Sequence, residues 1–150
     1  MSAQILALIE SPATELAVTE SLSRSGHSVL VVPTFPKAIG ILQGVHVDLI
    51  ISDVHLENGG NVFDFLKWVK TNPLLGFIPF VLLSCEPTIL AMYLEDGIKT
   101  SARMLGATKY IRMNTFDSDE LRQQIDPLLS EANHDDSDIK TAIFKDRWVK

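Results

Sequence analysis

The sequence predicts an α/β fold: a single doubly wound sheet of five parallel strands with helices on both faces. Five short apolar runs alternate along the chain with longer stretches whose apolar residues recur at helical spacing. The third run holds three consecutive apolar residues, Leu49, Ile50 and Ile51, as expected for a strand buried on both faces of a parallel sheet. Because crossover connections between parallel strands are right-handed, few topologies fit this order of elements.

The first half of the chain is predicted to hold three strands and two helices. In chain order these are a strand at 5–9, a helix at 13–24, a strand at 29–32, a helix at 34–44 and a strand at 47–53. Pro12 suits the first turn of the first helix, where a backbone amide has no partner, and Gly26 marks the end of that helix. The second helix carries a buried stripe of Ala38, Ile39, Ile41 and Leu42.

The second half is predicted to add three helices and two strands. In chain order these are a helix at 62–70, a strand at 78–83, a helix at 87–105, a strand at 109–113 and a helix that ends near Leu129. The helix at 62–70 is amphipathic, with Asp64, Lys67 and Lys70 expected on its solvent face. The helical pattern of 87–105 is interrupted at Asp96-Gly97, and Asp117 or Ser118 caps the last helix.

Length and composition favour one soluble domain and exclude several classes of function. With 150 residues, 46% of them hydrophobic and 21% charged, the chain can bury a core without disulfides or structural metals. A net charge of −6 argues against nucleic acid, since phosphate binding needs a basic face. No apolar run is long enough to span a membrane, so no membrane partner is expected. A single cysteine, Cys85, excludes an internal disulfide and a cysteine zinc cluster, and the expected location is cytoplasmic.

The C-terminal residues differ in composition from the rest. We expect a globular domain over 1–130, followed over 131–150 by an acidic linker and a short amphipathic helix that begins at Ile139. This tail either packs on its own domain or frays, or it docks on a partner or a second copy of the chain, with Phe144 and Trp148 as anchors. A homodimer is therefore one alternative.

Polar residues follow the predicted strands at the edge where ligands bind in open α/β sheets. Glu10 follows the first strand, Asp53 the third and Ser84 the fourth, and residues 110–114 end the fifth. Two carboxylates with a neighbouring hydroxyl and a nearby cation are what Mg²⁺-assisted phosphoryl transfer requires. Asp53 taken alone allows a simpler interpretation, since aspartate also favours the turn that begins a helix.

Four motifs lie in order at these positions: ILALIESP, DLIISDVHLENGG, IPFVLLS and GATKYIRMN. Over residues 4–130 the sequence thereby resembles the receiver (CheY-like) domain of two-component response regulators, which has a flavodoxin-like topology. The resemblance implies that Asp53 accepts a phosphoryl group, that Ser84 hydrogen-bonds this group and that Tyr110 is the aromatic switch residue. It also implies a Mg²⁺ site formed by Glu10, Asp53 and the backbone carbonyl of His55.

The resemblance further implies the partners and the kind of activity. The phosphoryl donor would be a histidine kinase or a phosphotransfer protein, and the output would be binding of a downstream protein target. Such a domain is a switch in a phosphorelay rather than a metabolic enzyme.

Two positions depart from the receiver pattern. Receivers usually have two acidic residues after the first strand, and Ile9 replaces the first of them. Ile9 offers no oxygen ligand, so the Mg²⁺ site is expected to be weakened. The family's lysine after the fifth strand is replaced by Met113, which cannot pair with a phosphoryl oxygen. Strand alternation directs the adjacent Arg112 to the opposite face, which leaves open whether Arg112 replaces the lysine.

Two hypotheses remain open, and two others are disfavoured. The domain is either a phosphorylation-dependent switch or a pseudo-receiver that binds its partner constitutively without phosphorylation. A flavodoxin-like cofactor protein would need a glycine-containing phosphate loop after the first strand, and residues 11–14 hold no glycine. A thiol enzyme is disfavoured because Cys85 adjoins an apolar strand and is expected to be a small buried hydrophobe. No metal-ligand spacing links the histidines, which are expected on the surface or in loops: His27, His46, His55 and His134.

Overall fold

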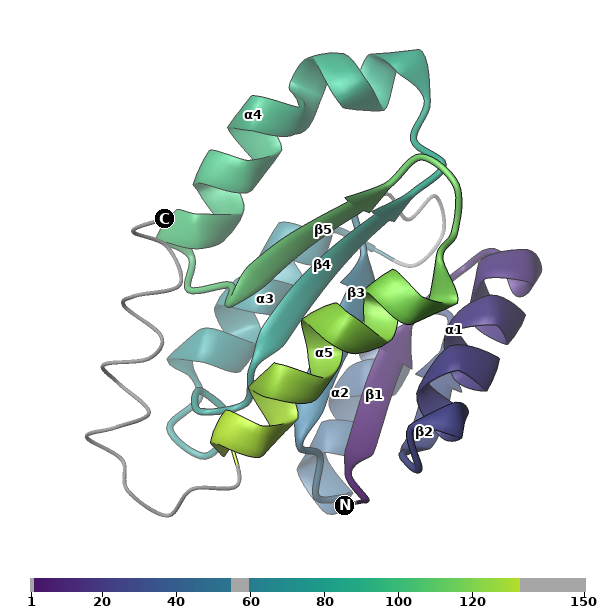
Figure 1. Cartoon of the computed structure of the whole chain (residues 1–150). Coiled ribbons are helices and arrows are strands. Elements are labelled where there is room, and N and C mark those ends of the chain that lie inside the picture. The colour runs from purple at the N-terminus through teal and green to yellow at the C-terminus, as the bar shows by residue number, and fades with distance from the viewer. Residues whose placement is uncertain (1, 55–59, 133–150) are drawn as a thin grey trace.

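A computed structural model describes residues 2–54 and 60–132 of the chain. They form five parallel strands in the order β2-β1-β3-β4-β5 (Figure 1), which confirms the predicted fold class. The strands are β1 Gln4–Leu8, β2 Ser28–Val32, β3 Leu49–Asp53, β4 Phe80–Cys85 and β5 Lys109–Met113. Leu49, Ile50 and Ile51 are fully buried, as their apolar run predicted.

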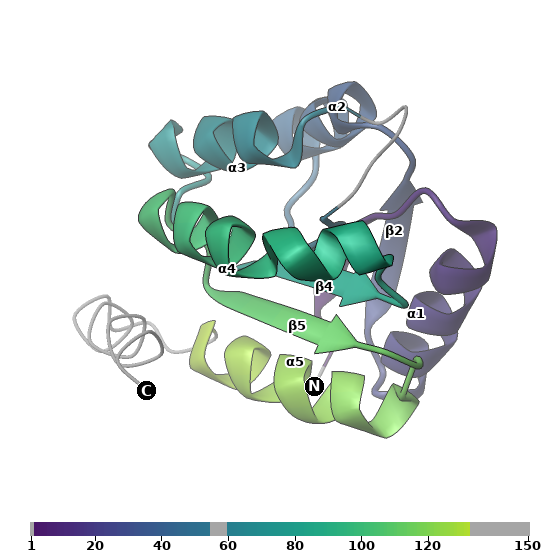
Figure 2. The ribbon, with the colours of Figure 1, turned by 90° about the horizontal axis from the view of Figure 1, so that it is seen from above.

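Five helices cover the two faces of the sheet. They are α1 Pro12–Arg24, α2 Phe35–Gly44, α3 Val62–Thr71, α4 Ile89–Met104 and α5 Ser118–Ala132. Figure 2 shows α1 and α5 on one face and α2, α3 and α4 on the other. Each face has its own hydrophobic core, because side chains alternate between the two faces along every strand.

The predicted interruption of the fourth helix at Asp96-Gly97 is wrong, because α4 continues through both residues. Nothing lies within 4 Å of a Cβ placed on Gly97, so this glycine is on the open side of the helix. Glycine inside an exposed stretch of helix costs only about 1 kcal/mol relative to alanine. The helix tolerates that cost, and its capping residue Thr88 accepts a hydrogen bond from the Ala91 amide at 3.1 Å.

Lys70 was expected to face solvent, and this prediction is also wrong. Its Nζ donates hydrogen bonds to the backbone oxygens of Gly76 at 3.1 Å and Ile78 at 2.7 Å. Burial lowers the pKa of Lys70 to about 8. The Lys70 stem also packs against the turn after α4, where a Cβ on Gly106 (φ +100°) would lie 3.2 Å from Lys70 Cγ. The turn that follows α3 folds back over the lysine, and helical periodicity gives no sign of this.

His27 was expected on the surface or in a loop; it lies in the loop before β2, and its side chain is only 6% exposed. The Ala3 amide donates to Nδ1 at 3.2 Å, and Nε2 lies 3.1 Å from Asp126 Oδ1. His27 therefore joins the start of β1 to α5. His46 is 84% exposed, as expected.

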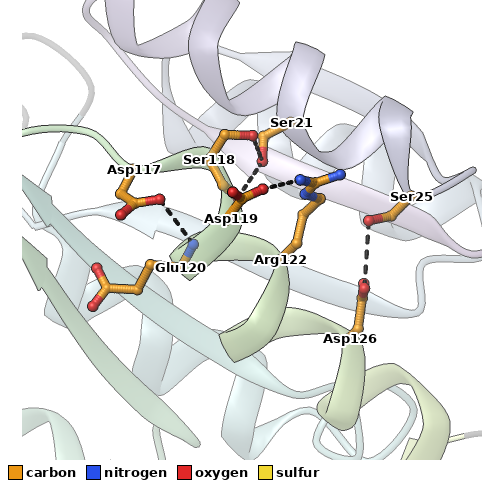
Figure 3. A network of polar contacts seen from close by, with 8 residues as sticks. All are labelled: Ser21, Ser25, Asp117, Ser118, Asp119, Glu120, Arg122 and Asp126. Carbon is orange, nitrogen blue, oxygen red and sulfur yellow. Dashed lines mark hydrogen bonds and ion pairs between the residues drawn. The ribbon is translucent and has the colours of Figure 1, made fainter.

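Further polar contacts join α1 to α5 (Figure 3). The Ser21 hydroxyl donates to the Ser118 backbone oxygen at 3.0 Å, and the Ser25 hydroxyl donates to Asp126 at 3.4 Å. Asp117 accepts from the Glu120 amide at 3.1 Å and so acts as the predicted cap of α5. These contacts hold α5 against α1 on the face of the sheet that carries Ile9 and Met113.

The last helix continues past the predicted end near Leu129 to Ala132, the last described residue. The expected amphipathic segment that begins at Ile139, with Phe144 and Trp148, lies outside the described residues, as do His55 and His134. Within the described ranges, no helix is long and apolar enough to cross a membrane.

Candidate functional site

A cavity of about 460 Å³ opens at the carboxyl edge of the sheet, beyond β1, β3 and β4. Its polar lining includes three carboxylates and four hydroxyls: Glu10, Asp53, Glu86, Ser11, Thr14, Ser84 and Thr88. The edge is the one at which ligands bind in open α/β sheets. The structure therefore brings Glu10, Asp53 and Ser84 together, as the order of the strands predicted.

Asp53 ends β3 and is partly buried. The Glu10 amide donates a hydrogen bond to Asp53 Oδ2 at 3.1 Å. Burial raises the pKa of Asp53 to about 6; the Glu10 amide opposes this rise and the negative charge of Glu10 adds to it. Asp53 is therefore mostly ionised at neutral pH.

Ser84 lies on the neighbouring strand β4 and is only 4% exposed. It lines the same cavity as Asp53. A buried hydroxyl can donate one hydrogen bond to a group that enters the cavity. This position suits the predicted role of binding a phosphoryl oxygen.

Tyr110 on β5 is half-buried and interacts with Ser84. Burial raises the pKa of the Tyr110 phenol, a hydrogen bond with Ser84 lowers it, and the Glu95 side chain raises it by charge and by hydrogen bonding. Lys99 Nζ lies 5.4 Å from the centre of the Tyr110 ring. The predicted switch residue therefore lies beside α4, with Lys99 of that helix near its ring.

The two positions that depart from the receiver pattern lie in the hydrophobic core. Ile9 is 1% exposed and Met113 is 2% exposed, and both belong to the cluster on the α1 and α5 face. Within the part of the chain that the structure describes, no lysine or arginine lines the cavity. A cation that would pair with a phosphoryl oxygen is therefore missing from the described lining.

Arg112 points away from this core, as strand alternation predicted. Its Nε lies 3.4 Å from Glu95 Oε2 on α4. Arg112 thus neutralises a carboxylate of the fourth helix and does not line the cavity.

Sequence reasoning missed one wall of the cavity, which is formed by Cys85 at the end of β4 and by Glu86 and Thr88 after it. Glu86 has a left-handed backbone (φ +51°), and its amide donates to the Met113 oxygen at 2.7 Å. Cys85 is half-buried rather than fully buried, and burial is the main cause that raises the pKa of its thiol. The sequence held one sign that Cys85 belongs to the cavity wall: it directly follows Ser84 at the end of the same strand.

Mg²⁺ is the metal that the resemblance implies, and the carboxylates present fit it. Glu10 and Asp53 repel each other electrostatically, and a bound cation would relieve this repulsion. Mg²⁺ often takes one or two protein carboxylates and keeps several waters. No group of three His, Cys, Asp or Glu residues suited to a metal occurs in the described ranges. The third implied ligand, the carbonyl of His55, lies outside them.

No family model matches this sequence, and no curated protein sequence matches it. Solved structures do match the fold. The chemotaxis response regulator CheY4 of Vibrio cholerae is 24% identical with a TM-score of 0.71, over 85% of this chain and 99% of that one. The signal receiver domain of a signal transduction histidine kinase from Syntrophus aciditrophicus is 24% identical with a TM-score of 0.73, over 90% of this chain and 96% of that one.

A two-component response regulator from Clostridium difficile is 18% identical with a TM-score of 0.73, over 88% of this chain and 99% of that one. These neighbours are response regulators and receiver domains, and the similarity shows that this chain has their fold. The resemblance inferred from the four motifs is thus confirmed for the fold.

Proposed function

We propose that this chain is a receiver domain of two-component signalling, a phosphorylation-dependent protein-interaction switch in which Asp53 is the phosphoacceptor. The observation that carries this proposal is the position of Asp53 in an open cavity beside Glu10 and the buried hydroxyl of Ser84. The same cavity lies at the strand edge that binds ligands in this class of fold. The match to receiver structures along most of the chain supports the same function.

In the proposed transfer, an Asp53 carboxylate oxygen attacks the phosphorus of a phosphohistidine on a histidine kinase or phosphotransfer protein. The phosphorus–nitrogen bond of the donor breaks as the new phosphorus–oxygen bond forms, and the leaving imidazole takes up a proton from water. Ser84 donates its hydrogen to a phosphoryl oxygen. Mg²⁺ held by Glu10 and Asp53 would offset the negative charge of the transferred group. With Ile9 in place of a second acid, we propose that the site binds Mg²⁺ weakly.

The output of the switch is proposed to be contact with a downstream protein in the cytoplasm, or with a second copy of the chain. Several large apolar side chains of α4 are exposed, among them Ile89, Leu90 and Tyr93. Exposed apolar patches on a soluble domain often mark protein interaction sites. The domain acts by binding and does not turn over a metabolite.

A second candidate is a pseudo-receiver that binds a partner protein constitutively. Met113 in the core and Arg112 on Glu95 favour this alternative, because together they leave the described lining without a cation. A phosphoryl group on Asp53 would then lack its usual ion pair. The two candidates differ in whether Asp53 is modified.

Beryllofluoride, which mimics a phosphoryl group on a carboxylate, separates the two candidates. We would titrate it in the presence of Mg²⁺ and follow backbone amide NMR shifts, with Asp53→Asn as the control. The switch predicts saturable shifts at Asp53, Ser84 and Tyr110 that are absent in the control. A flat response at high Mg²⁺ would favour the pseudo-receiver.

A further inference from the structure

Three large apolar side chains lie exposed at the amino edge of the sheet, opposite the cavity. Leu74 is 86% exposed and Phe77 is 70% exposed, both in the turn that joins α3 to β4. Met104, at the end of α4, is 80% exposed. We call these three side chains the basal patch. Exposed apolar side chains that gather in one place often mark an interaction site.

Lys70 joins the two turns that carry the basal patch. Its Nζ donates to the backbone oxygens of Gly76 and Ile78 in the turn after α3. In the turn after α4, a Cβ placed on Gly106 would lie 3.2 Å from Lys70 Cγ. The three side chains of the basal patch therefore lie on adjoining turns.

The turn after α3 is held in place, although two of its apolar side chains are exposed. The Asn72 side chain accepts a hydrogen bond from the Leu74 amide at 2.9 Å, and the Asn72 backbone oxygen accepts one from the Gly76 amide at 2.9 Å. Leu75 of the same turn packs against the core on the α2, α3 and α4 face. The turn therefore presents its exposed side chains at a fixed place, so binding does not have to order it.

The described part of the chain ends at this same edge. Figure 2 shows the ends of α3, α4 and α5 on one side of the molecule, and α5 ends at Ala132. Residues 133–138, the predicted acidic linker, span at most about 20 Å when extended. This length is enough to cross from α5 to the basal patch, because packed layers lie about 10 Å apart. The exposed residues Ile89 and Leu90 are farther away, about 22 Å along α4 from Met104.

Residues 139–150 carry side chains that suit this patch. Phe144 and Trp148 are four residues apart, so they share one face of the helix predicted for this segment. Aromatic rings pack well against other rings and against methionine sulfur, the groups that Phe77 and Met104 offer. Because a short linker joins the segment to the domain, its effective concentration at the patch is on the order of millimolar. A separate partner would need that concentration to compete equally.

We propose that residues 139–150 dock on the basal patch of their own chain, with the two aromatic side chains of the segment packed against the three side chains of the patch. Docking removes these apolar groups from water. The inference goes beyond the proposed function and makes no use of Asp53, which lies at the opposite edge of the sheet.

The first test measures how far Trp148 is shielded from solvent. Trp68→Phe serves as the background, because it leaves Trp148 as the only tryptophan. We expect acrylamide to quench Trp148 about fivefold less than free tryptophan, since a segment at millimolar effective concentration is docked most of the time. Phe77→Ser should restore the quenching, whereas Leu90→Ser, the matched control at the other end of α4, should not. Full quenching in the background, or equal quenching in the two serine variants, would overturn the proposal.

The second test keeps Trp68 and so does not depend on a substitution near the core. We would compare backbone amide NMR shifts of the unsubstituted chain with those of the double variant Phe144→Ser, Trp148→Ser. The amides of Phe77 and Met104 should shift, and that of Leu90 should stay in place. Shifts at Leu90 alone, or no shifts at all, would contradict docking on the basal patch.

The third test distinguishes the chain's own patch from the patch of a second copy. The quenching of Trp148 should be the same from micromolar to submillimolar protein, because docking within one chain does not depend on concentration. Sedimentation should show a monomer over the same range. Protection of Trp148 that disappears on dilution would place the segment on a second copy and overturn the proposal.

Discussion

Ile9 and Met113 belong to one hydrophobic core cluster, between the sheet and helices α1 and α5. They stand at the two positions where the resemblance to receivers implies an acid and a lysine. The exchange removes one negative and one positive charge, so the net charge around the cavity changes little. What it removes is the cation that would pair with a phosphoryl oxygen. At these two positions, apolar side chains pack in the core where the resemblance to receivers implies charged side chains.

Restoring the lysine should strengthen phosphoryl binding. We expect Met113→Lys to raise the beryllofluoride affinity by about tenfold, since a hydrogen bond to a charged group contributes about 1.5–3 kcal/mol. The variant should also lose about 2 kcal/mol of stability, because Met113 is buried in the core. Met113→Leu keeps the side-chain volume without the charge and is the control for affinity. Equal affinities of Met113→Lys and Met113→Leu would show that the missing lysine does not limit the site.

The buried carboxylate of Asp53 should make stability depend on pH in a defined direction. Its pKa rises from 3.8 to about 6 in the folded chain, so the folded state binds more protons than the unfolded state between these values. Stability contributed by this group therefore increases as pH falls from about 7 to about 4. We expect Asp53→Asn to be more stable than the unsubstituted chain by about 1–3 kcal/mol at pH 8, and the difference to disappear near pH 4. Urea unfolding at both pH values measures the stability difference between the two chains. A difference that stays constant with pH would contradict the raised pKa of Asp53.

The two histidine–aspartate pairs should differ sharply in their contribution to stability. The His27 ring accepts from the Ala3 amide and lies against Asp126, whereas the His46 ring is exposed beside Asp48 at 2.7 Å. We expect His27→Ala to cost about 2–3 kcal/mol, because it leaves the Ala3 amide without its acceptor. His46→Ala is expected to change stability by less than about 0.5 kcal/mol.

The same geometry fixes the tautomer of His27. Because Nδ1 accepts a hydrogen bond from a backbone amide, the ring hydrogen must be on Nε2, facing Asp126. Nitrogen NMR of the imidazole should show the ring hydrogen on Nε2. A hydrogen on Nδ1 would contradict the contact with Ala3.

Lys70 and Lys67 form a second matched pair on one helix. Lys70→Met removes the donor of two backbone carbonyls, so we expect it to cost about 1–3 kcal/mol in chemical denaturation. Lys67 is exposed, and Lys67→Met should change stability by less than about 0.5 kcal/mol. Similar costs for the two variants would contradict the structural role of Lys70.

The pH dependence of stability provides a second test of the burial of Lys70. The pKa of Lys70 falls from 10.5 to about 8 in the folded chain, so its charged form is disfavoured by folding. The stability difference between the unsubstituted chain and Lys70→Met should therefore grow as pH rises from 8 toward 10. A difference that shrinks over this range would contradict the burial of the amine.

The sequence was sufficient to predict the elements and the strand ends. The apolar run Leu49 to Ile51 predicted β3 and placed Asp53 at its end. The apolar runs of β4 and β5 placed Ser84 and Tyr110 on those strands in the same way. Local patterns are sufficient here because they decide where strands begin and end. Contacts between distant parts of the chain were not predictable. His27 is buried because its partner lies 99 residues away on α5, and Lys70 is buried because a turn folds over it.

The wall of the cavity after β4 was missed for a different reason. Glu86 adopts a left-handed backbone, which non-glycine residues seldom adopt, and no residue type marks that turn in advance. The inward position of Glu95 was missed because the same helix exposes its large apolar residues, which reverses the usual amphipathic pattern.

Phosphoryl transfer to Asp53 is the central claim, and intact-mass spectrometry tests it most directly. The chain would be incubated with saturating Mg²⁺ and phosphoramidate, a small donor with a phosphorus–nitrogen bond, at a pH above the pKa of Asp53. We predict that the chain gains the mass of one phosphoryl group, that hydroxylamine removes this group as expected for an acyl phosphate, and that Asp53→Asn gains nothing. An unchanged mass, or an equal gain in Asp53→Asn, would contradict the account.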